Sequence, residues 1–411
     1  MVTDFYWPFV GGVEEHVRRL SQALAARGHS VAVVTLAHGE LAAFEQDGPV
    51  RVHRVRSSMQ RAGWLFASRG RPWAPPFPDP EVTRSLHRIL GAEQPEIVHG
   101  HDWLARAFLP LRGHHPARFV MSLHYYTLAC AKKSLMHKGA PCAGPALTKC
   151  LGCAAQHYGR LKGSTVALAN RVMSAAERAA VDMFLPVSQA TADANGLTTE
   201  DRCRVIPNFM PDERGPAGDQ AAYLAQLPAG PFLLFVGDLR RDKGIDVLLA
   251  AYAALAQAPP LVLIGKVWAD TPAVFPPDVM VFRNWPNEAV LAAWERCLMG
   301  VIPSVWPEPF GIVVIEALAS GRPIVASRTG GIPEILSQGA AGVLVPPGDA
   351  VALQQAIERL LADTEAREAL GRAARQRAAA FSAGAVVPRV EQVYAELLQP
   401  PVSAHAAHAA R

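Results

Sequence analysis

Two carboxylates in an apolar stretch are the strongest candidates for chemistry in this sequence. Glu308 lies at the end of a proline-fixed loop that begins at Pro303, and Glu316 falls in the second turn of an apolar helix expected from Phe310 onward. Burying a carboxylate without hydrogen-bond donors is strongly unfavourable, so the sequence predicts donors for Glu316. Those donors are hydroxyl groups of a ligand or, in a purely structural alternative, a neighbouring arginine, with Glu308 capping the helix.

Basic and glycine-rich turns form a second set of candidates. The loop VGDLRRDKG, Val236 to Gly244, follows an expected strand and precedes an expected helix, so its cations could neutralise a diphosphate. Gly11 and Gly12 lie in the first strand-to-helix turn, where missing side chains let backbone N–H groups approach an anion or a sugar. Each turn also fits an ordinary solvated connection. The cations of the loop are Arg240, Arg241 and Lys243.

Histidines follow two of the expected strands. His124 comes directly after the strand Phe119–Leu123 and should project at the carboxyl edge of the sheet, where ligands bind in open α/β folds. The alternative is a loop histidine that is hydrogen-bonded to the backbone. In VHGHDW, the residues His99, His101 and Asp102 follow another strand, and His101 or Asp102 could meet an acceptor substrate.

Four cysteines fall close together in one Gly- and Pro-rich insertion, residues 128–160. They end in the C-x-x-C pair of KCLGC, and four thiolates with this pairing could hold a structural Zn²⁺ that orders the insertion. A disulfide or redox pair and unlinked thiols are the alternatives. Because the insertion follows His124, we expect it to overhang the acceptor side of the site. The four residues are Cys130, Cys142, Cys150 and Cys153.

Strands and helices alternate along the whole chain, which predicts an α/β fold with doubly wound parallel sheets. The pattern starts with a short strand at Met1–Tyr6 and restarts at Phe232–Val236, after a Pro- and Gly-rich linker at 207–231. We therefore expect an amino-terminal domain at 1–206, a carboxy-terminal domain at 207–384, a helix at 385–398 that crosses back, and a disordered tail at 399–411.

Composition limits the class of protein. With 411 residues, of which 50% are hydrophobic and 18% charged, the chain fits two globular domains. It has neither a run of about 20 apolar residues nor a secretory pattern at its start, so a cytoplasmic address is expected. The amino-terminal half is net basic and the other half net acidic. The segment Arg61–Pro78 mixes aromatic and basic residues, which suits either an anchored loop or contact with a lipid-linked acceptor at the inner membrane face.

Taken together, four motifs closely resemble one family. GGVEEH, VGDLRRDKG, EPFGIVVIE and TGGIPE, at positions 11–16, 236–244, 308–316 and 329–334, occur in the order and spacing of the retaining family 4 glycosyltransferases. The resemblance covers essentially the whole chain. It implies the GT-B fold, in which two Rossmann-like domains face each other across a central cleft, one for a nucleotide sugar and one for the acceptor.

The resemblance also implies roles for individual residues. Glu316 would bind the ribose hydroxyls, Lys243 the diphosphate, and Glu308 the donor sugar, with His124 beside the reacting sugar. The family usually has arginine where this chain has Asp238, so Arg240 or Arg241 would supply that charge. Catalytic roles thus fall to Glu308, His124 and Lys243. The implied donor-binding residues are Gly11, Gly12, Arg240, Lys243, Arg283, Glu308, Pro309, Phe310, Gly311, Ile312 and Glu316.

The implied reaction is transfer of a hexose, with retention, from a UDP- or GDP-sugar to a hydroxyl acceptor and without a catalytic metal. The acceptor would be a small molecule, a glycan or a lipid-linked glycan, and nucleic acid is not an expected partner. Two rivals remain open: an epimerase or phosphorylase on the same fold, and a non-catalytic scaffold that binds nucleotide sugars.

Overall fold

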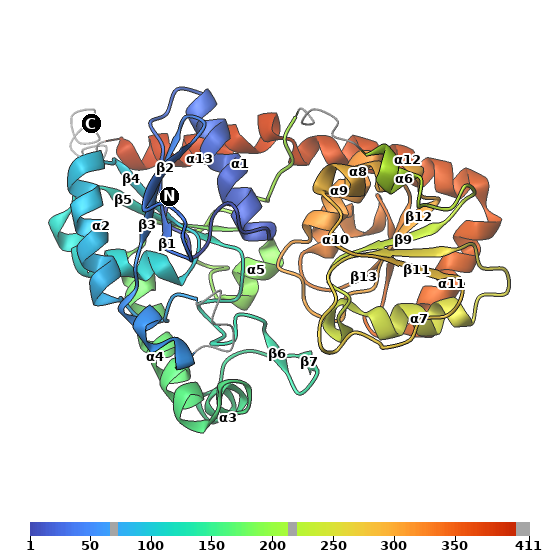
Figure 1. The fold of residues 1–411 in the computed structure, drawn as a ribbon, viewed down its shortest axis with the longest axis horizontal. Coiled ribbons are helices and arrows are strands. Elements are labelled where there is room, and N and C mark those ends of the chain that lie inside the picture. Colours follow the sequence, from blue (N-terminus) through green and yellow to red (C-terminus); the bar gives the residue numbers. More distant parts are fainter. Residues whose placement is uncertain (66–72, 213–219, 400–411) are drawn as a thin grey trace, which may run out of the picture.

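The computed structural model describes residues 1–65, 73–212 and 220–399 of the chain. Two α/β halves lie beside each other, one running from blue to green and the other from yellow to red in Figure 1. The expected tail falls outside the described residues from position 400 onward. Among the helices of the described segments, none is long and apolar enough to cross a membrane.

The carboxy-terminal half contains one parallel sheet of six strands in the order β11-β10-β9-β12-β13-β14. This is the doubly wound order, and its switch point lies between β9 and β12, where ligands bind in such folds. The strands are β9 (Leu233–Val236), β10 (Leu261–Ile264), β11 (Val279–Phe282), β12 (Met299–Ile302), β13 (Ile324–Ser327) and β14 (Val343–Val345).

Both faces of this sheet are apolar because alternate strand residues enter two different cores. Leu234 and Val262 pack in one hydrophobic cluster, and Leu233 and Leu261 pack in the other. Helices therefore cover both faces. They are α6 (Ala221–Leu224), α7 (Ile245–Ala253), α8 (Asn287–Arg296), α9 (Ile312–Ser320), α10 (Ile332–Ile335), α11 (Ala350–Ala362) and α12 (Thr364–Ala378).

The amino-terminal half repeats the same order with a shortened first strand. Val2 alone bridges β1 at Val34 and β4 at Gly100, so it joins β1-β3 and β4-β5-β8 into one parallel sheet. An antiparallel edge strand, β2, which the sequence did not predict, adds to β3. The strands are β1 (Ala32–Leu36), β2 (Phe44–Asp47), β3 (Val50–Val55), β4 (Ile97–Gly100), β5 (Arg118–Leu123) and β8 (Met183–Pro186).

The helices of this half include α1 (Gly12–Ala26), α2 (Pro80–Glu93) and α5 (Gln189–Ala194). The cysteine-rich insertion forms a hairpin followed by two helices: β6 (Met136–His137), β7 (Ala140–Pro141), α3 (Leu147–Tyr158) and α4 (Arg160–Ala180). In Figure 1 these elements reach down and toward the carboxy-terminal half.

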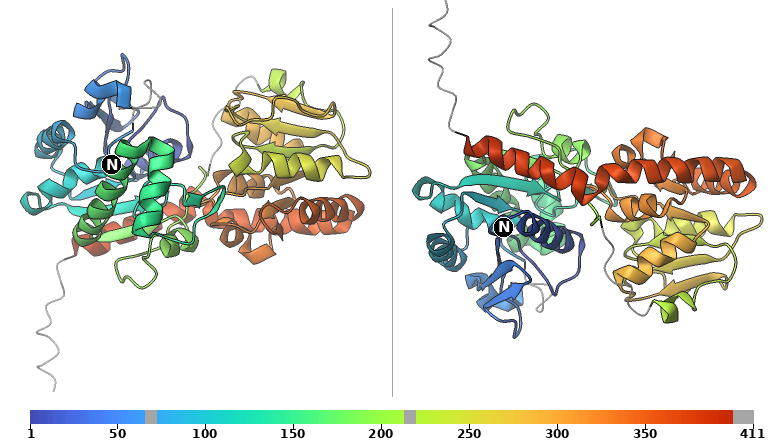
Figure 2. Two further views of the ribbon diagram at one scale, coloured as in Figure 1. Left: turned by 90° about the horizontal axis from the view of Figure 1, so that it is seen from below. Right: turned by 90° about the horizontal axis from the view of Figure 1, so that it is seen from above.

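The last helix, α13 (Ala383–Leu398), lies along the amino-terminal half, as the red helix shows in the right panel of Figure 2. Val386, Val390 and Val393 pack in the same cluster as Val17 of α1. The segment that enters α13 is bonded to the other connection between the halves. Met210 N–H donates to the Phe381 carbonyl at 2.9 Å, and Gly384 N–H donates to Asp212 at 2.8 Å.

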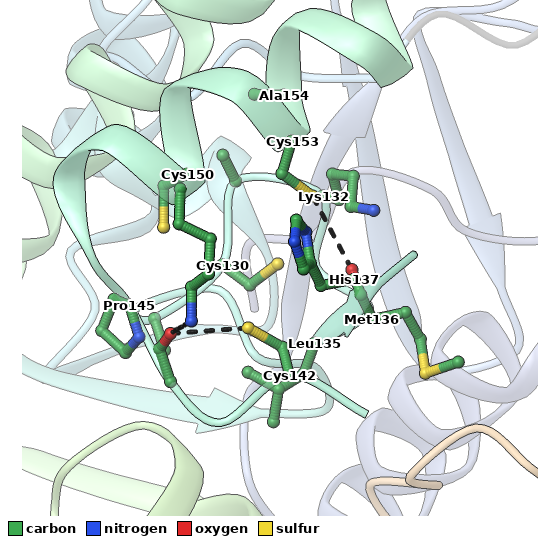
Figure 3. A pocket seen from close by; sticks show the side chains of 14 residues that line it. Cys130, Lys132, Leu135, Met136, His137, Cys142, Pro145, Cys150, Cys153 and Ala154 are labelled. Atoms are coloured by element: carbon green, nitrogen blue, oxygen red, sulfur yellow. Dashed lines mark hydrogen bonds between the residues drawn. The ribbon is translucent and has the colours of Figure 1, made fainter. Parts of the chain in front are cut away.

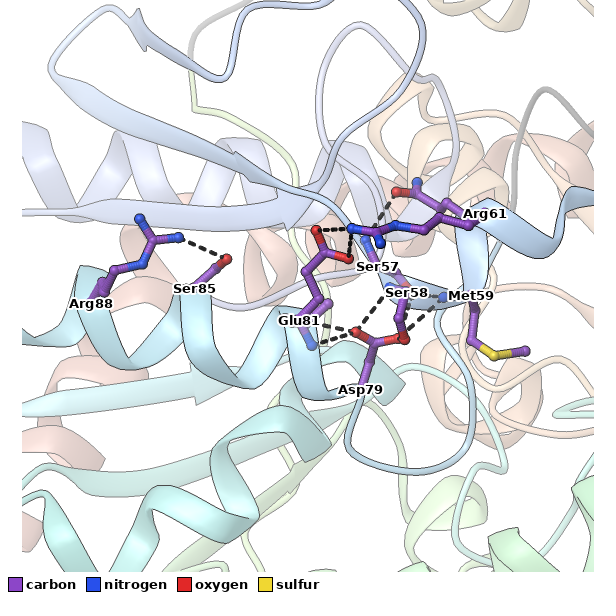
Figure 4. A network of polar contacts seen from close by, with 10 residues as sticks. Ser57, Ser58, Met59, Arg61, Asp79, Glu81, Ser85 and Arg88 are labelled. Atoms are coloured by element: carbon purple, nitrogen blue, oxygen red, sulfur yellow. Dashed lines mark hydrogen bonds and ion pairs between the residues drawn. The ribbon is translucent and has the colours of Figure 1, made fainter.

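A buried aspartate fixes the start of α2. Asp79 is 2% exposed and accepts hydrogen bonds from the backbone of Glu81 and Val82 and from the hydroxyls of Ser57 and Ser58 (Figure 4). Burial alone would raise the pKa of Asp79, but these hydrogen bonds outweigh burial and hold the pKa below its usual value. The carboxylate thus stabilises the fold above the ordinary pKa of aspartate, and this contribution is lost as the pH falls through the lower folded-state pKa.

Asp79→Ala is expected to lower the free energy of unfolding by about 2 kcal/mol, because it removes the helix cap and leaves buried donors without an acceptor. Urea denaturation at neutral pH measures this. The matched control is Asp349→Ala, which removes a similar cap from α11 at an exposed position and should have about half the effect. Equal losses from both variants would contradict the role given to the buried network.

Candidate active site

A lysine–glutamate pair lies at the switch point of the carboxy-terminal sheet. Lys243 follows β9 and Glu308 follows β12, and Lys243 Nζ is 2.6 Å from Glu308 Oε1. Ser304 donates its hydroxyl to the same oxygen at 2.8 Å, and the Lys243 ammonium lies 4.6 Å from the centre of the Trp306 ring. The structure therefore brings together the cation and the carboxylate that the sequence predicted for the donor.

Glycines let three loops interlock around this pair. Gly244 has a φ of +79°, and a Cβ added there would lie 1.9 Å from the Pro303 carbonyl oxygen. Gly330 has a φ of +55°, and its Cβ would lie 2.0 Å from the Glu308 carbonyl oxygen, which also accepts a hydrogen bond from Gly331. Any side chain at either glycine would push the loops apart, so the TGGIPE and VGDLRRDKG motifs both hold Glu308 in position.

Glu316 lies in the second turn of α9 and is 6% exposed. The helix begins at Ile312, two residues later than expected, since Gly311 adopts a φ of +106°. Asn287 Nδ2 donates to Glu316 Oε1 at 3.2 Å, and burial raises the pKa of the carboxyl group. The hydrogen-bond partner is thus an amide rather than the arginine of the structural alternative. A single amide leaves acceptor capacity for ligand hydroxyls.

The amino-terminal half meets this site through its glycine turn. A Cβ on Gly12 would lie 3.2 Å from Ile312 Cδ1, and one on Gly11 would lie 2.3 Å from the Glu14 carboxylate. Gly11 is also the residue before α1, where N–H groups lack intrahelical partners. The turn therefore presents backbone rather than side chains toward the start of α9.

Four contacts that the sequence analysis missed tie the Glu308 loop to the amino-terminal half. Ser188, which caps α5, and Thr191 of α5 donate hydroxyl hydrogen bonds to the Pro309 carbonyl at 2.5 and 3.0 Å. Tyr126 Oη donates to the Pro307 carbonyl at 2.7 Å, and Trp306 Nε1 donates to the Ser134 carbonyl at 2.6 Å. Of these contacts, the one made by Ser188 could have been suspected from the sequence, because Ser188 comes just after β8 at the carboxyl edge of the sheet. The insertion residue Ser134 thus touches the donor side of the molecule.

Three histidines meet at the carboxyl edge of the amino-terminal sheet. One ring nitrogen of each of His16, His101 and His124 lies within 4.8 Å of the others, and His101 Nδ1 is 3.2 Å from His124 Nε2. Burial lowers the pKa of all three, to about 4 for His124. The rings are therefore neutral at pH 7 and could accept or donate one hydrogen bond each, and their nitrogens are close enough to share a metal ion. Sequence reasoning assigned no role to His16.

Family models match both halves of the chain. The model described as Glycosyltransferase Family 4 matches residues 10–214, and the model described as Glycosyl transferases group 1 matches residues 225–377. The chain belongs to the family 4 glycosyltransferases. The resemblance inferred from the four motifs is confirmed, and so is the GT-B fold.

Relatives of this glycosyltransferase extend over nearly its full length. D-inositol 3-phosphate glycosyltransferase of Arthrobacter sp. (strain FB24) is 29% identical over 90% of this chain and 86% of its own. Glycogen synthase of Mycobacterium tuberculosis is 28% identical over 96% of this chain and 93% of its own. Sucrose-phosphate synthase from Thermosynechococcus elongatus has a TM-score of 0.71 at 22% identity and covers 94% of both chains. HepE from Anabaena in complex with UDP-glucose has a TM-score of 0.64 at 18% identity, covering 97% of this chain and 98% of its own.

The other side chains predicted for the donor site of this glycosyltransferase differ in their partners and in their burial. Arg240 pairs with Asp242 at 3.3 Å and lies 3.8 Å from Asp270, so two carboxylates already lie next to its charge. Arg241 pairs with Asp246 at 3.2 Å on the surface. Arg283 is exposed and Phe310 is buried in the core, so Phe310 can offer a ligand its backbone alone.

The three candidate residues after β4 differ in whether other side chains already occupy their polar atoms. His99 bonds Tyr394 of α13 at 2.6 Å and Ser122 at 2.8 Å, so both of its ring nitrogens are occupied. Asp102 is bonded to Lys133 of the insertion, which also lies 3.7 Å from Asp4. Burial raises the pKa of Asp4 to about 7. Of the three candidates in VHGHDW, His101 keeps one ring nitrogen, Nε2, without a hydrogen-bond partner among the described residues.

The buried histidines make the glycosyltransferase sensitive to acid. An unfolded chain binds a proton to His124 near pH 6.5, but the folded chain resists protonation until about pH 4. The neutral His124 ring therefore contributes about 3 kcal/mol to the free energy of unfolding above pH 6.5. This contribution is lost as the pH falls toward 4. Urea denaturation between pH 7.5 and 4.5 measures the free energy of unfolding. This free energy should fall less with decreasing pH in His124→Gln than in the parent. His87→Gln, at an exposed position of α2, should leave the decline unchanged.

Proposed function

We propose that this glycosyltransferase moves a hexose from a UDP- or GDP-sugar to a hydroxyl acceptor with retention of configuration. The observation that carries the proposal is the Lys243–Glu308 pair at the switch point, with buried Glu316 on the adjoining helix. A fixed cation beside a carboxylate suits a ligand that has a diphosphate next to sugar hydroxyls. Complexes of HepE with UDP and with UDP-glucose are known for the same fold and support a nucleotide-sugar donor.

In the proposed reaction the acceptor oxygen attacks the anomeric carbon from the face that the diphosphate leaves. The bond from the anomeric carbon to the phosphate oxygen breaks as the new glycosidic bond forms, and the departing phosphate takes the acceptor proton. Lys243 stabilises the charge that develops on the diphosphate, and no step requires a metal ion.

The remaining roles concern binding. Glu308 accepts hydrogen bonds from sugar hydroxyls and Glu316 from the ribose, while His124 lies beside the reacting sugar. Backbone groups of 309–312 and of the Gly11–Gly12 turn complete the donor site. Arg283, which follows β11, contacts the base in this proposal.

A non-catalytic scaffold is the second candidate, and one observation favours it. Asp238 stands where the family usually has an arginine, and Arg240, which could replace it, is engaged with Asp242. Lys243 would then be the main cation for the leaving group.

The test incubates the protein with UDP-, GDP- and ADP-sugars and a panel of hydroxyl acceptors. Proton NMR of the product should show the anomeric configuration of the donor, and donor hydrolysis should appear without an acceptor. Nucleotide binding without turnover on any donor would favour the scaffold, and an inverted product would refute retention.

We further propose a cytoplasmic enzyme that touches the inner membrane face through the segment 61–78, with a small molecule, a glycan or a lipid-linked glycan as its acceptor. Trp64 and Phe66 of this segment lie outside the described side chains. Trp73 is 40% exposed and packs edge-on against Phe5, so part of the segment is anchored. Sedimentation with anionic vesicles tests the contact, and equal recovery with and without vesicles would refute it.

A further inference from the structure

The four clustered cysteines and one histidine of the insertion surround a single small cavity of about 30 Å³. Figure 3 shows Cys150 and Cys153 reaching it from α3 and Cys142 reaching it from another side. Cys150 and Cys153 are three residues apart on one helix, so both sulfur atoms lie on the same helical face. Cys130 and Cys142 flank the hairpin β6–β7. The fold thus converges on this cavity from a loop, a hairpin and a helix.

We propose that Cys130, Cys142, Cys150 and Cys153 bind one zinc ion as a tetrahedral thiolate site. Zinc–sulfur bonds of about 2.3 Å place the sulfur atoms about 3.8 Å apart. In the described part of the chain no three of these sulfurs lie within 4.8 Å of one another, so the thiol side chains must rotate inward on binding. All four cysteines are partly exposed. Water can therefore take up the proton that each thiol releases when it binds the metal ion.

The backbone around Cys130 is arranged for a thiolate. Backbone N–H groups of Lys132, Ser134 and Leu135 approach its sulfur atom. Lys133 and Leu135 adopt φ values of +62° and +53°, which let the loop fold back around the sulfur atom. N–H groups converging on a desolvated sulfur stabilise its negative charge, so this loop is suited to a metal-bound thiolate.

Two of the other thiols, those of Cys142 and Cys153, bond to backbone carbonyls, and these bonds do not explain why the four cysteines cluster. Cys142 Sγ is 3.4 Å from the Gly144 carbonyl, and Cys153 Sγ is 3.8 Å from the Met136 carbonyl. His137 also lines the cavity, and its buried Nδ1 has no hydrogen-bond partner among the described residues. The cavity therefore offers donors in excess of four, and the thiolates are the preferred set for zinc.

Zinc here would act on the candidate active site through the loop between Cys130 and the hairpin. Ser134 in that loop accepts the hydrogen bond from Trp306, and Trp306 lies against Lys243. A metal ion that fixes the loop therefore fixes a contact of the Glu308 loop. This inference is independent of the donor and of the acceptor that the enzyme uses.

The test measures zinc in the full-length protein, purified without a metal-affinity step, by native mass spectrometry and elemental analysis. About one zinc ion per chain is expected. Zinc chloride added back to chelator-treated protein should restore it, with sulfur scattering alone in the first shell of the X-ray absorption spectrum. Protein that carries no zinc and takes up none after chelation would overturn the proposal.

Thiol counting separates zinc from disulfides. Denatured, unreduced protein with chelator should yield all six thiols of the sequence; four or fewer would indicate disulfides and overturn the proposal. Each of the four Cys→Ser variants should lose at least about tenfold in zinc affinity, while Cys203→Ser and His137→Ala keep it. Retention in any of the four, or loss in His137→Ala, would overturn this ligand set.

Discussion

Lys243→Ala is expected to lower kcat by about 10²- to 10³-fold with a smaller change in the KM for the donor. The reason is that the ammonium stabilises charge that develops on the diphosphate as the bond breaks, and ground-state binding is shared with other groups. Steady-state kinetics with the donor identified from the nucleotide-sugar panel measures both constants. Lys243→Arg keeps the positive charge next to Glu308 and should recover part of the rate.

The matched control for this variant is Lys266→Ala. Lys266 is exposed, follows β10 of the same sheet and lies over the Trp268 ring at 4.7 Å, as Lys243 lies over Trp306. It has no place in the proposed site, so its removal should leave kcat unchanged. An unaltered kcat in Lys243→Ala, or an equal loss in both variants, would rule out the role assigned to Lys243.

Glu316→Ala is expected to weaken nucleotide binding by about 10- to 100-fold, the loss of one or two hydrogen bonds to a charged group. Isothermal titration with the free nucleoside diphosphate measures this without relying on turnover. Glu316→Gln keeps the shape and one acceptor oxygen, and it should lose less than the alanine variant.

Stability must be separated from binding in this case, because removing a buried carboxylate also leaves Asn287 without its acceptor. The thermal midpoint of each variant without nucleotide provides that comparison. Glu368→Ala, at an exposed position of α12, serves as the control and should bind nucleotide like the parent. Parent-like binding by Glu316→Ala would contradict the assignment to the ribose.

The sequence predicted the fold well because its signals are local. Apolar runs such as Leu261–Ile264 and glycine turns such as Gly244 identify strands and connections without knowledge of distant contacts. The short first strand was expected too, and the structure reduces it to a bridge at Val2. Element ends moved by up to three residues. The start of α9 moved by two, to Ile312, because the conformation of Gly311 decides where the helix begins.

The rest of the site depends on contacts between distant segments. His101 and His124 were each placed after a strand, but their proximity follows from the pairing of β4 with β5. Arg240 was expected near the diphosphate because of its sequence neighbours; Asp270, from the loop after β10, instead lies beside it. The contact of Trp306 with Ser134 joins residues 172 positions apart, and no local pattern indicates it.

The bonded crossing between the two halves restricts how they can move. The chain passes from one half to the other near Met210 and returns near Ser382, and these segments are hydrogen-bonded to each other rather than spread over the interface. Two tethers joined at one place form a single pivot between the halves. The Glu308 loop and the Gly11–Gly12 turn are therefore expected to separate for substrate entry and approach for transfer by rotation about this pivot, while the crossing itself stays closed.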